Sequence, residues 1–111
     1  MEIQEEKHGA VTVVRPMGAL VQHDAEQLRK VLNEVVPRSL GRLVIDAASI
    51  AYVDSKGLEA LVTATESLGK AGQTLRLCNA NETLREVLEL TEVAPMFEHY
   101  KDVSDGVRSF L

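Results

Sequence analysis

A change of apolar period between residues 53 and 58 constrains the fold of this chain more than any other feature of its sequence. Residues 43–53 are mostly apolar, as in a strand. After residue 57, apolar residues recur every three or four positions, as on one helix face, at Leu58, Leu61, Val62 and Leu68. The segment Asp54-Ser55-Lys56-Gly57 lies between the two patterns. The sequence therefore predicts a strand that passes directly into a helix, with a serine at the helix N-terminus.

Two strands and a helix are expected before this point. Residues 3–7 and 10–15 have strand character, and the turn between them suits a two-residue hairpin. The second strand is expected to stop at Pro16, because proline cannot donate a ladder hydrogen bond. Asp24 is the predicted N-cap of the first helix, with Gln27 in the capping-box position. Pro37 and Gly41 are expected to end that helix, whose apolar stripe is Leu28, Val31, Leu32, Val35 and Val36.

The same alternation continues to the end of the chain. Residues 75–78 form a predicted strand, and Asn79 or Asn81 is expected to cap the next helix. A short strand near residues 96–100 and a terminal helix over residues 102–111 complete the series. The predicted order is β-β-α-β-α-β-α-β-α. It indicates a single α/β domain over residues 1–111, with a mixed, mostly parallel sheet opened by an N-terminal hairpin and packed with about four helices.

Composition narrows the classes of function. The formal net charge of −5 disfavours direct nucleic-acid binding, which needs a concentrated positive surface. The acidic N-terminus does not resemble a signal peptide, and no apolar run is long enough to insert into a membrane. A single cysteine cannot form an internal disulfide. These features together predict a cytoplasmic protein.

The residue patterns do not indicate an enzyme. His8, His23 and His99 lack the spacing of a metal site, and nothing near Cys78 would activate a thiolate. Residues 67–70 match S-x-x-K by letter, but the companion motifs of that class are missing. A nucleophile elbow at Ser55 would need a glycine two residues earlier, where valine stands. We therefore predict no catalytic, cofactor or metal site.

Ser55 has two possible roles at the helix N-terminus. It could cap the helix, or it could accept a phosphate beside unpaired backbone N–H groups and the positive end of the helix dipole. Asp54 already offers a cap, so a second capping residue exceeds what stability requires. Gly57 lowers helix propensity, and we interpret its missing side chain as room for a partner to approach Ser55. The residues alone leave both roles open.

The sequence around Ser55 resembles a known family. Residues 50–58, IAYVDSKGL, are similar to the signature of STAS domains of anti-sigma factor antagonists, an apolar run followed by Asp-Ser-(Ser or Thr)-Gly-Leu. The similarity continues through residues 69–78, GKAGQTLRLC, and into the helix and strand that follow. It covers essentially the whole chain. The sequence departs from the family pattern at Lys56, where the family usually has serine or threonine.

This resemblance implies a switch controlled by phosphorylation. Ser55 matches the phosphorylated serine, and Asp54, Ser55, Lys56 and Gly57 match the partner-binding segment. In the family, the unphosphorylated form binds an anti-sigma factor that is a serine kinase, and the sigma factor is released. Phosphorylation by that kinase ends the interaction, and a serine phosphatase restores it. The same function is therefore expected of this chain.

Two alternatives have different consequences for Ser55. A STAS module could act as a scaffold or adaptor, as a transporter subunit or in a sensory assembly, without any phosphorylation of Ser55. A small enzyme could instead use Ser55 as its nucleophile. An unchanged mass after incubation with the candidate kinase and ATP would favour the scaffold. Reaction with a serine-directed fluorophosphonate would favour the enzyme.

Overall fold

The computed structural model describes residues 1–111 and contains one six-stranded mixed sheet. The main strand order is β1-β2-β3-β5-β6, and β4 pairs separately with the end of β2. Only the β1–β2 hairpin is antiparallel. This architecture confirms the predicted sheet. The strands are β1 Glu2–His8, β2 Val11–Leu20, β3 Leu43–Asp46, β4 Ile50–Val53, β5 Leu75–Cys78 and β6 Phe97–Tyr100.

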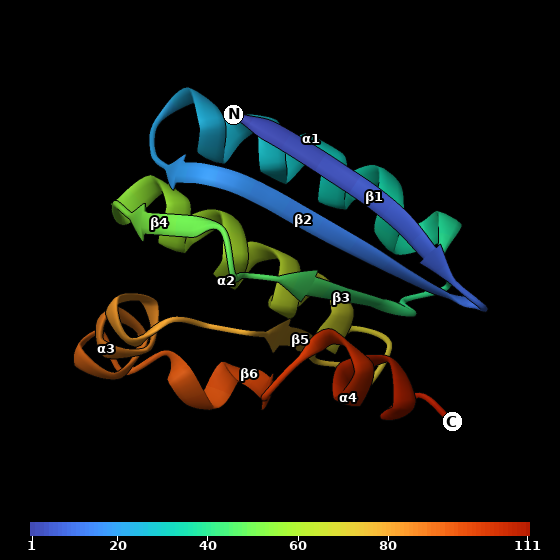
Figure 1. Cartoon of the computed structure of the whole chain (residues 1–111). Helices are drawn as coiled ribbons and strands as arrows, with labels where there is room; N and C mark the ends of the chain where they lie inside the picture. The colour runs from blue at the N-terminus through green and yellow to red at the C-terminus, as the bar shows by residue number, and fades with distance from the viewer.

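Helices cover both faces of the sheet (Figure 1). α1 and α2 lie side by side behind the sheet in this view, whereas α4 lies in front of it. α3 packs beside β4 and the short 3-10 turn Ala94–Met96. The four helices agree in number with the sequence prediction: α1 His23–Arg38, α2 Ser55–Gly69, α3 Glu82–Leu90 and α4 Val103–Arg108.

The main core lies between the sheet and the helices α1, α2 and α3. β3 is buried along its whole length because β2 and β5 flank it and helices cover it, as its continuous apolar sequence predicts. A smaller cluster on the opposite face packs under α4 and includes Val11, Val13, Val44 and Cys78. Among the largest fully buried side chains of the molecule are Leu20, Leu28, Leu32, Leu61, Leu77 and Leu84.

The predicted end of the second strand at Pro16 is wrong, because β2 continues to Leu20. β2 pairs with β3 over Thr12–Val14 and with β4 only from Gly18 onward. Pro16 lies between these two parallel ladders, where its missing N–H breaks no hydrogen bond of either. β2 can therefore cross from one neighbour to the other at the proline.

The structure also divides the expected strand over residues 43–53 into β3 and β4. The chain turns after Asp46, whose carboxylate accepts a hydrogen bond from the Ala48 N–H at 3.1 Å. Ile50 N–H then donates to the Ala47 carbonyl at 3.2 Å, and β4 joins β2 instead of extending β3. The sheet consequently has six strands where the sequence order indicated five.

Helix ends differ from the predictions at three places. α1 begins at His23, so Asp24 is not its N-cap; the Asp24 carboxylate instead accepts from the Met1 ammonium group at 2.9 Å. Pro37 is tolerated inside the last turn of α1, which ends at Arg38. α4 ends at Arg108 and is shorter than expected. The prediction for α3 is confirmed with Asn81 as the cap, since its side chain accepts from the Leu84 N–H at 2.8 Å.

Candidate functional site

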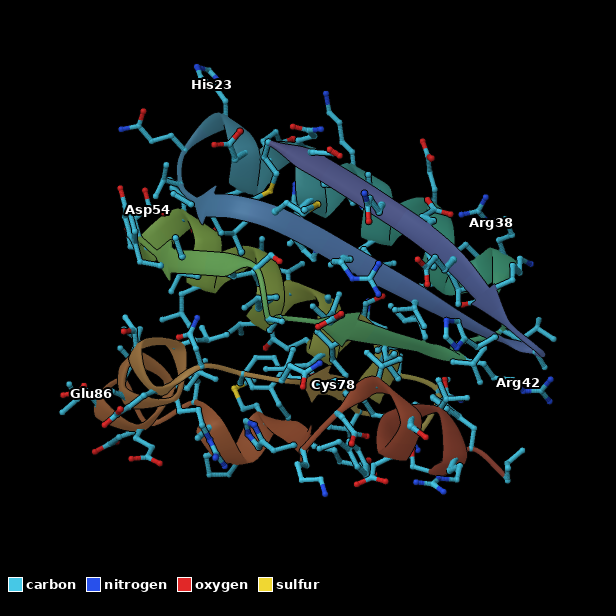
Figure 2. All side chains as sticks on the ribbon, viewed as in Figure 1. His23, Arg38, Arg42, Asp54, Cys78 and Glu86 are labelled. Carbon is cyan, nitrogen blue, oxygen red and sulfur yellow. The ribbon has the colours of Figure 1, made fainter.

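Ser55 is the first residue of α2 and lies where the carboxyl ends of β2 and β4 meet. Figure 2 shows Asp54 and His23 at this same end of the molecule, one from each of the two strand-to-helix connections. Carboxyl ends of parallel strands are the usual position of functional residues in α/β sheets. The side chain of Ser55 is exposed and makes no hydrogen bond within the chain.

Asp54, not Ser55, caps α2. The Asp54 carboxylate accepts from the Gly57 N–H at 2.8 Å and from the Gln22 N–H at 3.3 Å. The backbone N–H of Asp54 donates to the Leu20 carbonyl at 3.3 Å. The N–H groups of Ser55 and Lys56 have no acceptor in the chain, as expected of the first residues of a helix. The capping role is thus filled, and the Ser55 hydroxyl is left free beside two unpaired donors.

Gly57 is buried against the end of β2. A Cβ atom at this position would lie 2.1 Å from the Leu20 carbonyl oxygen and 3.0 Å from the Leu20 Cγ atom. The glycine therefore allows α2 to begin close against the β2 backbone. This packing within the chain accounts for Gly57, so the inference from sequence that the glycine makes room for a partner is not needed.

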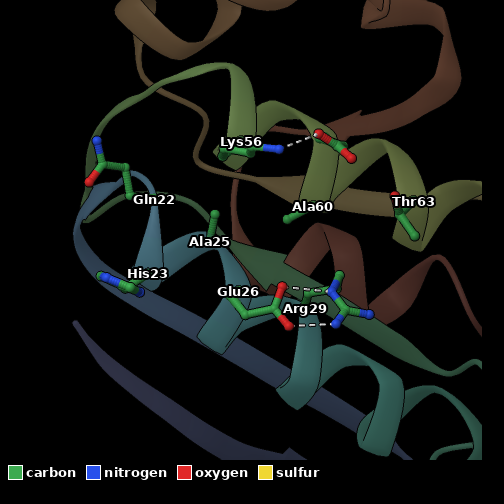
Figure 3. A pocket seen from close by; sticks show the side chains of 9 residues that line it. Gln22, His23, Ala25, Glu26, Arg29, Lys56, Ala60 and Thr63 are labelled. Atoms are coloured by element: carbon green, nitrogen blue, oxygen red, sulfur yellow. Dashed lines mark hydrogen bonds and ion pairs between the residues drawn. The ribbon is translucent and has the colours of Figure 1, made fainter.

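Lys56 points away from the core and forms only a long ion pair, with its Nζ atom 3.7 Å from the Glu59 carboxylate. A groove of about 390 Å³ lies next to it, between the first turns of α1 and α2 (Figure 3). Its floor includes two small residues, Ala25 and Ala60, and Glu26 pairs with Arg29 at its edge. Gln22, His23, Lys56, Glu59 and Thr63 complete the lining.

Gln22 and His23 belong to this surface, although no pattern in the sequence indicated it. Gln22 has a φ of 45° and a ψ of −112°, an unusual conformation for a residue other than glycine. The hydrogen bond from its N–H to Asp54 fixes the loop after β2 against the start of α2. The parallel pairing of β2 with β4 brings the loop after β2 next to the start of α2. The sequence did not indicate this pairing, because the pattern over residues 43–53 suggested one continuous strand.

Two buried titratable groups, Asp46 and Cys78, belong to the framework. Arg15 Nε donates to the Asp46 carboxylate at 2.8 Å, and Asn79 Nδ2 donates to the same carboxylate at 3.1 Å. Burial raises the pKa of Asp46, but the hydrogen bonds from Arg15, Asn79 and the Ala48 N–H outweigh it and lower the pKa below its usual value. Burial raises the pKa of the Cys78 thiol to about 12, which keeps it protonated.

The three histidines occupy separate places. His8 lies 3.2 Å from the Glu6 carboxylate on β1, His99 contacts the Ala94 carbonyl at 2.9 Å, and His23 borders the groove beside Lys56. No group of three or more histidine, cysteine or acidic side chains is arranged to hold a metal ion. None of the four helices combines the length and the apolar character needed to cross a bilayer.

Known proteins share both the sequence pattern and the fold. An anti-sigma F factor antagonist of Paenibacillus polymyxa is 21% identical over 103 residues, which cover 89% of this chain and 88% of that protein. An anti-sigma factor antagonist of Mycobacterium paratuberculosis has a crystal structure that superposes with a TM-score of 0.84 at 26% identity, covering 97% of this chain and 92% of that one.

A third similar protein has been solved in two covalent states. The Bacillus cell fate determinant SpoIIAA in its phosphorylated form has a TM-score of 0.74 at 18% identity, with 99% and 100% of the two chains covered. Its unphosphorylated form has a TM-score of 0.75 at 17% identity, with 98% and 96% covered. At these identities the comparison supports the fold alone. The family model of the STAS domain matches residues 2–106, and the chain therefore belongs to the STAS domain family.

Proposed function

We propose that this protein is a cytoplasmic, non-enzymatic anti-sigma factor antagonist that is switched by phosphorylation of Ser55. Its unphosphorylated form would bind an anti-sigma factor with serine-kinase activity and so free the sigma factor; a serine phosphatase would reverse the phosphorylation. The similarity to proteins named as anti-sigma factor antagonists supports the class of function. The observation that best supports the switch is the exposed, unbonded Ser55 hydroxyl at the start of α2.

The free protein can accommodate a phosphate at Ser55. The phosphate adds about −1.5 to −2 charges at neutral pH, and the N-terminus of a helix stabilises negative charge. Unpaired N–H groups of Ser55 and Lys56 are available at this end of α2. The Lys56 ammonium group is also weakly engaged, because its only ion pair is 3.7 Å long and both side chains are exposed.

At a docked interface the same phosphate would be unfavourable. The Asp54 carboxylate is held next to Ser55 by two hydrogen bonds, from Gly57 and Gln22, so it cannot easily turn away from a new negative charge. Exclusion of water strengthens the repulsion between like charges, which can cost several kcal/mol. Since about 1.4 kcal/mol changes affinity tenfold, one phosphate is sufficient to abolish a micromolar contact.

The proposed partner surface consists of Ser55 and Lys56 together with Gln22 and His23 across the groove. Asp54 and Gly57 would contribute differently, since one caps α2 and the other is buried against Leu20. We therefore propose that Asp54 and Gly57 stabilise the conformation of this surface. Lys56, which replaces the usual serine or threonine, would contact the partner directly and influence which kinase is recognised.

A pull-down from the native cytoplasm with wild-type and Ser55→Asp baits tests this function. The wild-type bait should retain a protein with a serine-kinase domain, identified by mass spectrometry, and the Ser55→Asp bait should lose it. Incubation with that kinase and ATP should add the mass of one phosphate to the wild-type protein. The same treatment should leave Ser55→Ala unchanged.

Ser104 provides a matched control. It is an exposed serine in the first turn of α4, a helix that is also capped by an aspartate, Asp102. Ser104→Asp should retain the kinase as well as the wild type does. Phosphorylation of Ser55→Ala would place the modified residue elsewhere. Equal retention by the wild-type and Ser55→Asp baits would favour a scaffold without this switch.

A further inference from the structure

A second hollow lies at the carboxyl ends of β5 and β6, and it shares no residue with the groove beside Lys56. Its volume is about 290 Å³. The first turn of α3 and the loop after β6 enclose it. This is the edge of a parallel sheet at which small ligands usually bind. The hollow is lined by Asn79, Ala80, Arg85, His99, Tyr100 and Lys101.

The lining is positively charged in an acidic protein. Arg85 and Lys101 form no ion pair, although the chain has a formal net charge of −5. Glu82 and Glu89 stand three residues before and four residues after Arg85 on α3, but neither carboxylate forms an ion pair with it. The two cationic side chains are therefore available to an external anion.

Two of the residues that line this hollow also have unpaired backbone N–H groups. The N–H groups of Ala80 and Lys101 donate to no other group of the chain. Asn79, which directly precedes Ala80, has a φ of 58°. It is held by two hydrogen bonds, from its N–H to the Tyr100 carbonyl at 3.2 Å and from its Nδ2 to the Asp46 carboxylate at 3.1 Å. The first bond joins the ends of β5 and β6, and the second joins Asn79 to Asp46 at the end of β3, so the backbone around these donors is fixed before any ligand arrives.

An adjoining hollow of about 260 Å³ has a different character. It shares Arg85 and His99 with the first, adds the less polar surfaces of Ala94, Pro95 and Phe97, and has one carboxylate, Glu89, in its lining. The His99 ring packs edge-on against Phe97, with ring centroids 6.4 Å apart, and its Nε2 contacts the Ala94 carbonyl at 2.9 Å. The two hollows together offer an anion site beside a partly apolar one.

We propose that these hollows bind a small phosphate monoester, with the phosphate between Arg85 and Lys101 and the organic group against Ala94 and Pro95. Both a carboxylate and a phosphate can accept two hydrogen bonds from the fork of a guanidinium group. A phosphate monoester has a third strong acceptor oxygen, which remains for Lys101. This site is independent of the proposed phosphorylation of Ser55.

Titration of the ¹⁵N-labelled protein in 150 mM NaCl tests the proposal, with phenyl phosphate, inorganic phosphate and phenol as probes. Phenyl phosphate should shift the amide signals of Ala80 and Lys101 in a saturable manner. Inorganic phosphate should bind at the same place at least threefold more weakly, and phenol should not bind. The titration is repeated with Ser55→Ala, which should give the same affinities.

Charge-neutralising variants locate the site. Arg85→Gln and Lys101→Gln should each weaken phenyl phosphate binding at least fivefold, with unchanged circular dichroism. Arg42→Gln removes an exposed cation that forms no ion pair and lies away from the two hollows, so it should bind as the wild type does (Figure 2). The proposal would be overturned by shifts that do not saturate or that are centred on Ser55. It would also be overturned by equal affinity for inorganic phosphate and phenyl phosphate, or by unchanged binding of phenyl phosphate to both Arg85→Gln and Lys101→Gln.

Discussion

Substitution of Gly57 by alanine tests whether this residue serves the fold. The new methyl group would lie 2.1 Å from the Leu20 carbonyl oxygen, a separation that real Cβ atoms do not show. Backbone atoms on both sides must therefore move. The shift would separate the start of α2 from the end of β2 and would strain the hydrogen bond from the Asp54 N–H to Leu20, which is already 3.3 Å long.

Opposing effects determine the size of the change. Alanine has the higher helix propensity and would stabilise the helix by about 1 kcal/mol in an unhindered position. Forcing an extra carbon into a packed site costs about 1–3 kcal/mol. Weakening of the Asp54 cap, through displacement of the Gly57 N–H, adds about 1 kcal/mol to this cost. We therefore expect Gly57→Ala to lower the free energy of unfolding by about 2 kcal/mol.

Urea denaturation followed by circular dichroism measures this difference. Gly69→Ala is a matched control, because Gly69 ends the same helix and a Cβ there would meet nothing within 4 Å. Gly69→Ala should be as stable as the wild type or more stable. If Gly57→Ala were also as stable as the wild type, the close contact with Leu20 would not explain the glycine, and a role in partner approach would regain support.

Three further predictions concern the cap, the ion pair and the thiol. Asp54→Ala should cost about 1 kcal/mol in urea denaturation, whereas Ser55→Ala should change stability by less than about 0.5 kcal/mol; equal losses would contradict the assignment of the cap. Asp46 has a lowered pKa, so its contribution to the free energy of unfolding is present above its unfolded pKa of about 3.9 and is lost as the pH falls through its folded pKa. Asp46→Asn should therefore be less stable than the wild type by about 2 kcal/mol at pH 7 and should lose less stability on acidification. Equal stability of the two proteins at pH 7 would show that the ion pair is inert. Cys78, with a pKa of about 12, should react with a disulfide reagent at pH 8 only after unfolding, and rapid labelling of the native protein would contradict its burial.

Sequence periodicity was sufficient for the fold class but not for the path of every strand. Apolar runs and helical stripes located all four helices, because burial of one face imposes a period that is visible in the sequence. The boundary between β3 and β4 was not visible, since residues 47–49 are small and interrupt the apolar character only weakly. The continuation of β2 past Pro16 depended on a change of neighbour, which is a property of the sheet and not of the local sequence.

The site was predictable in part, for a related reason. Local chemistry identified Asp54 as a cap, because a capping bond joins residues three positions apart. The role of Gly57 depends on Leu20, and the role of Gln22 depends on Asp54, so both required knowledge of contacts between distant segments. The ion pair of Arg15 with Asp46, across neighbouring strands, was missed for the same reason.

The first turn of α2 separates structural from exposed positions. Asp54 and Gly57 face β2 and are fixed by contacts with Gln22 and Leu20, whereas the intervening Ser55 and Lys56 side chains are exposed. A helix of 3.6 residues per turn produces this division, because residues 54 and 57 return to the same side. A charge added at Ser55 therefore changes the surface without removing a contact that holds the fold. Such a residue can be modified and restored repeatedly while the domain stays folded, which is the property that the proposed switch requires.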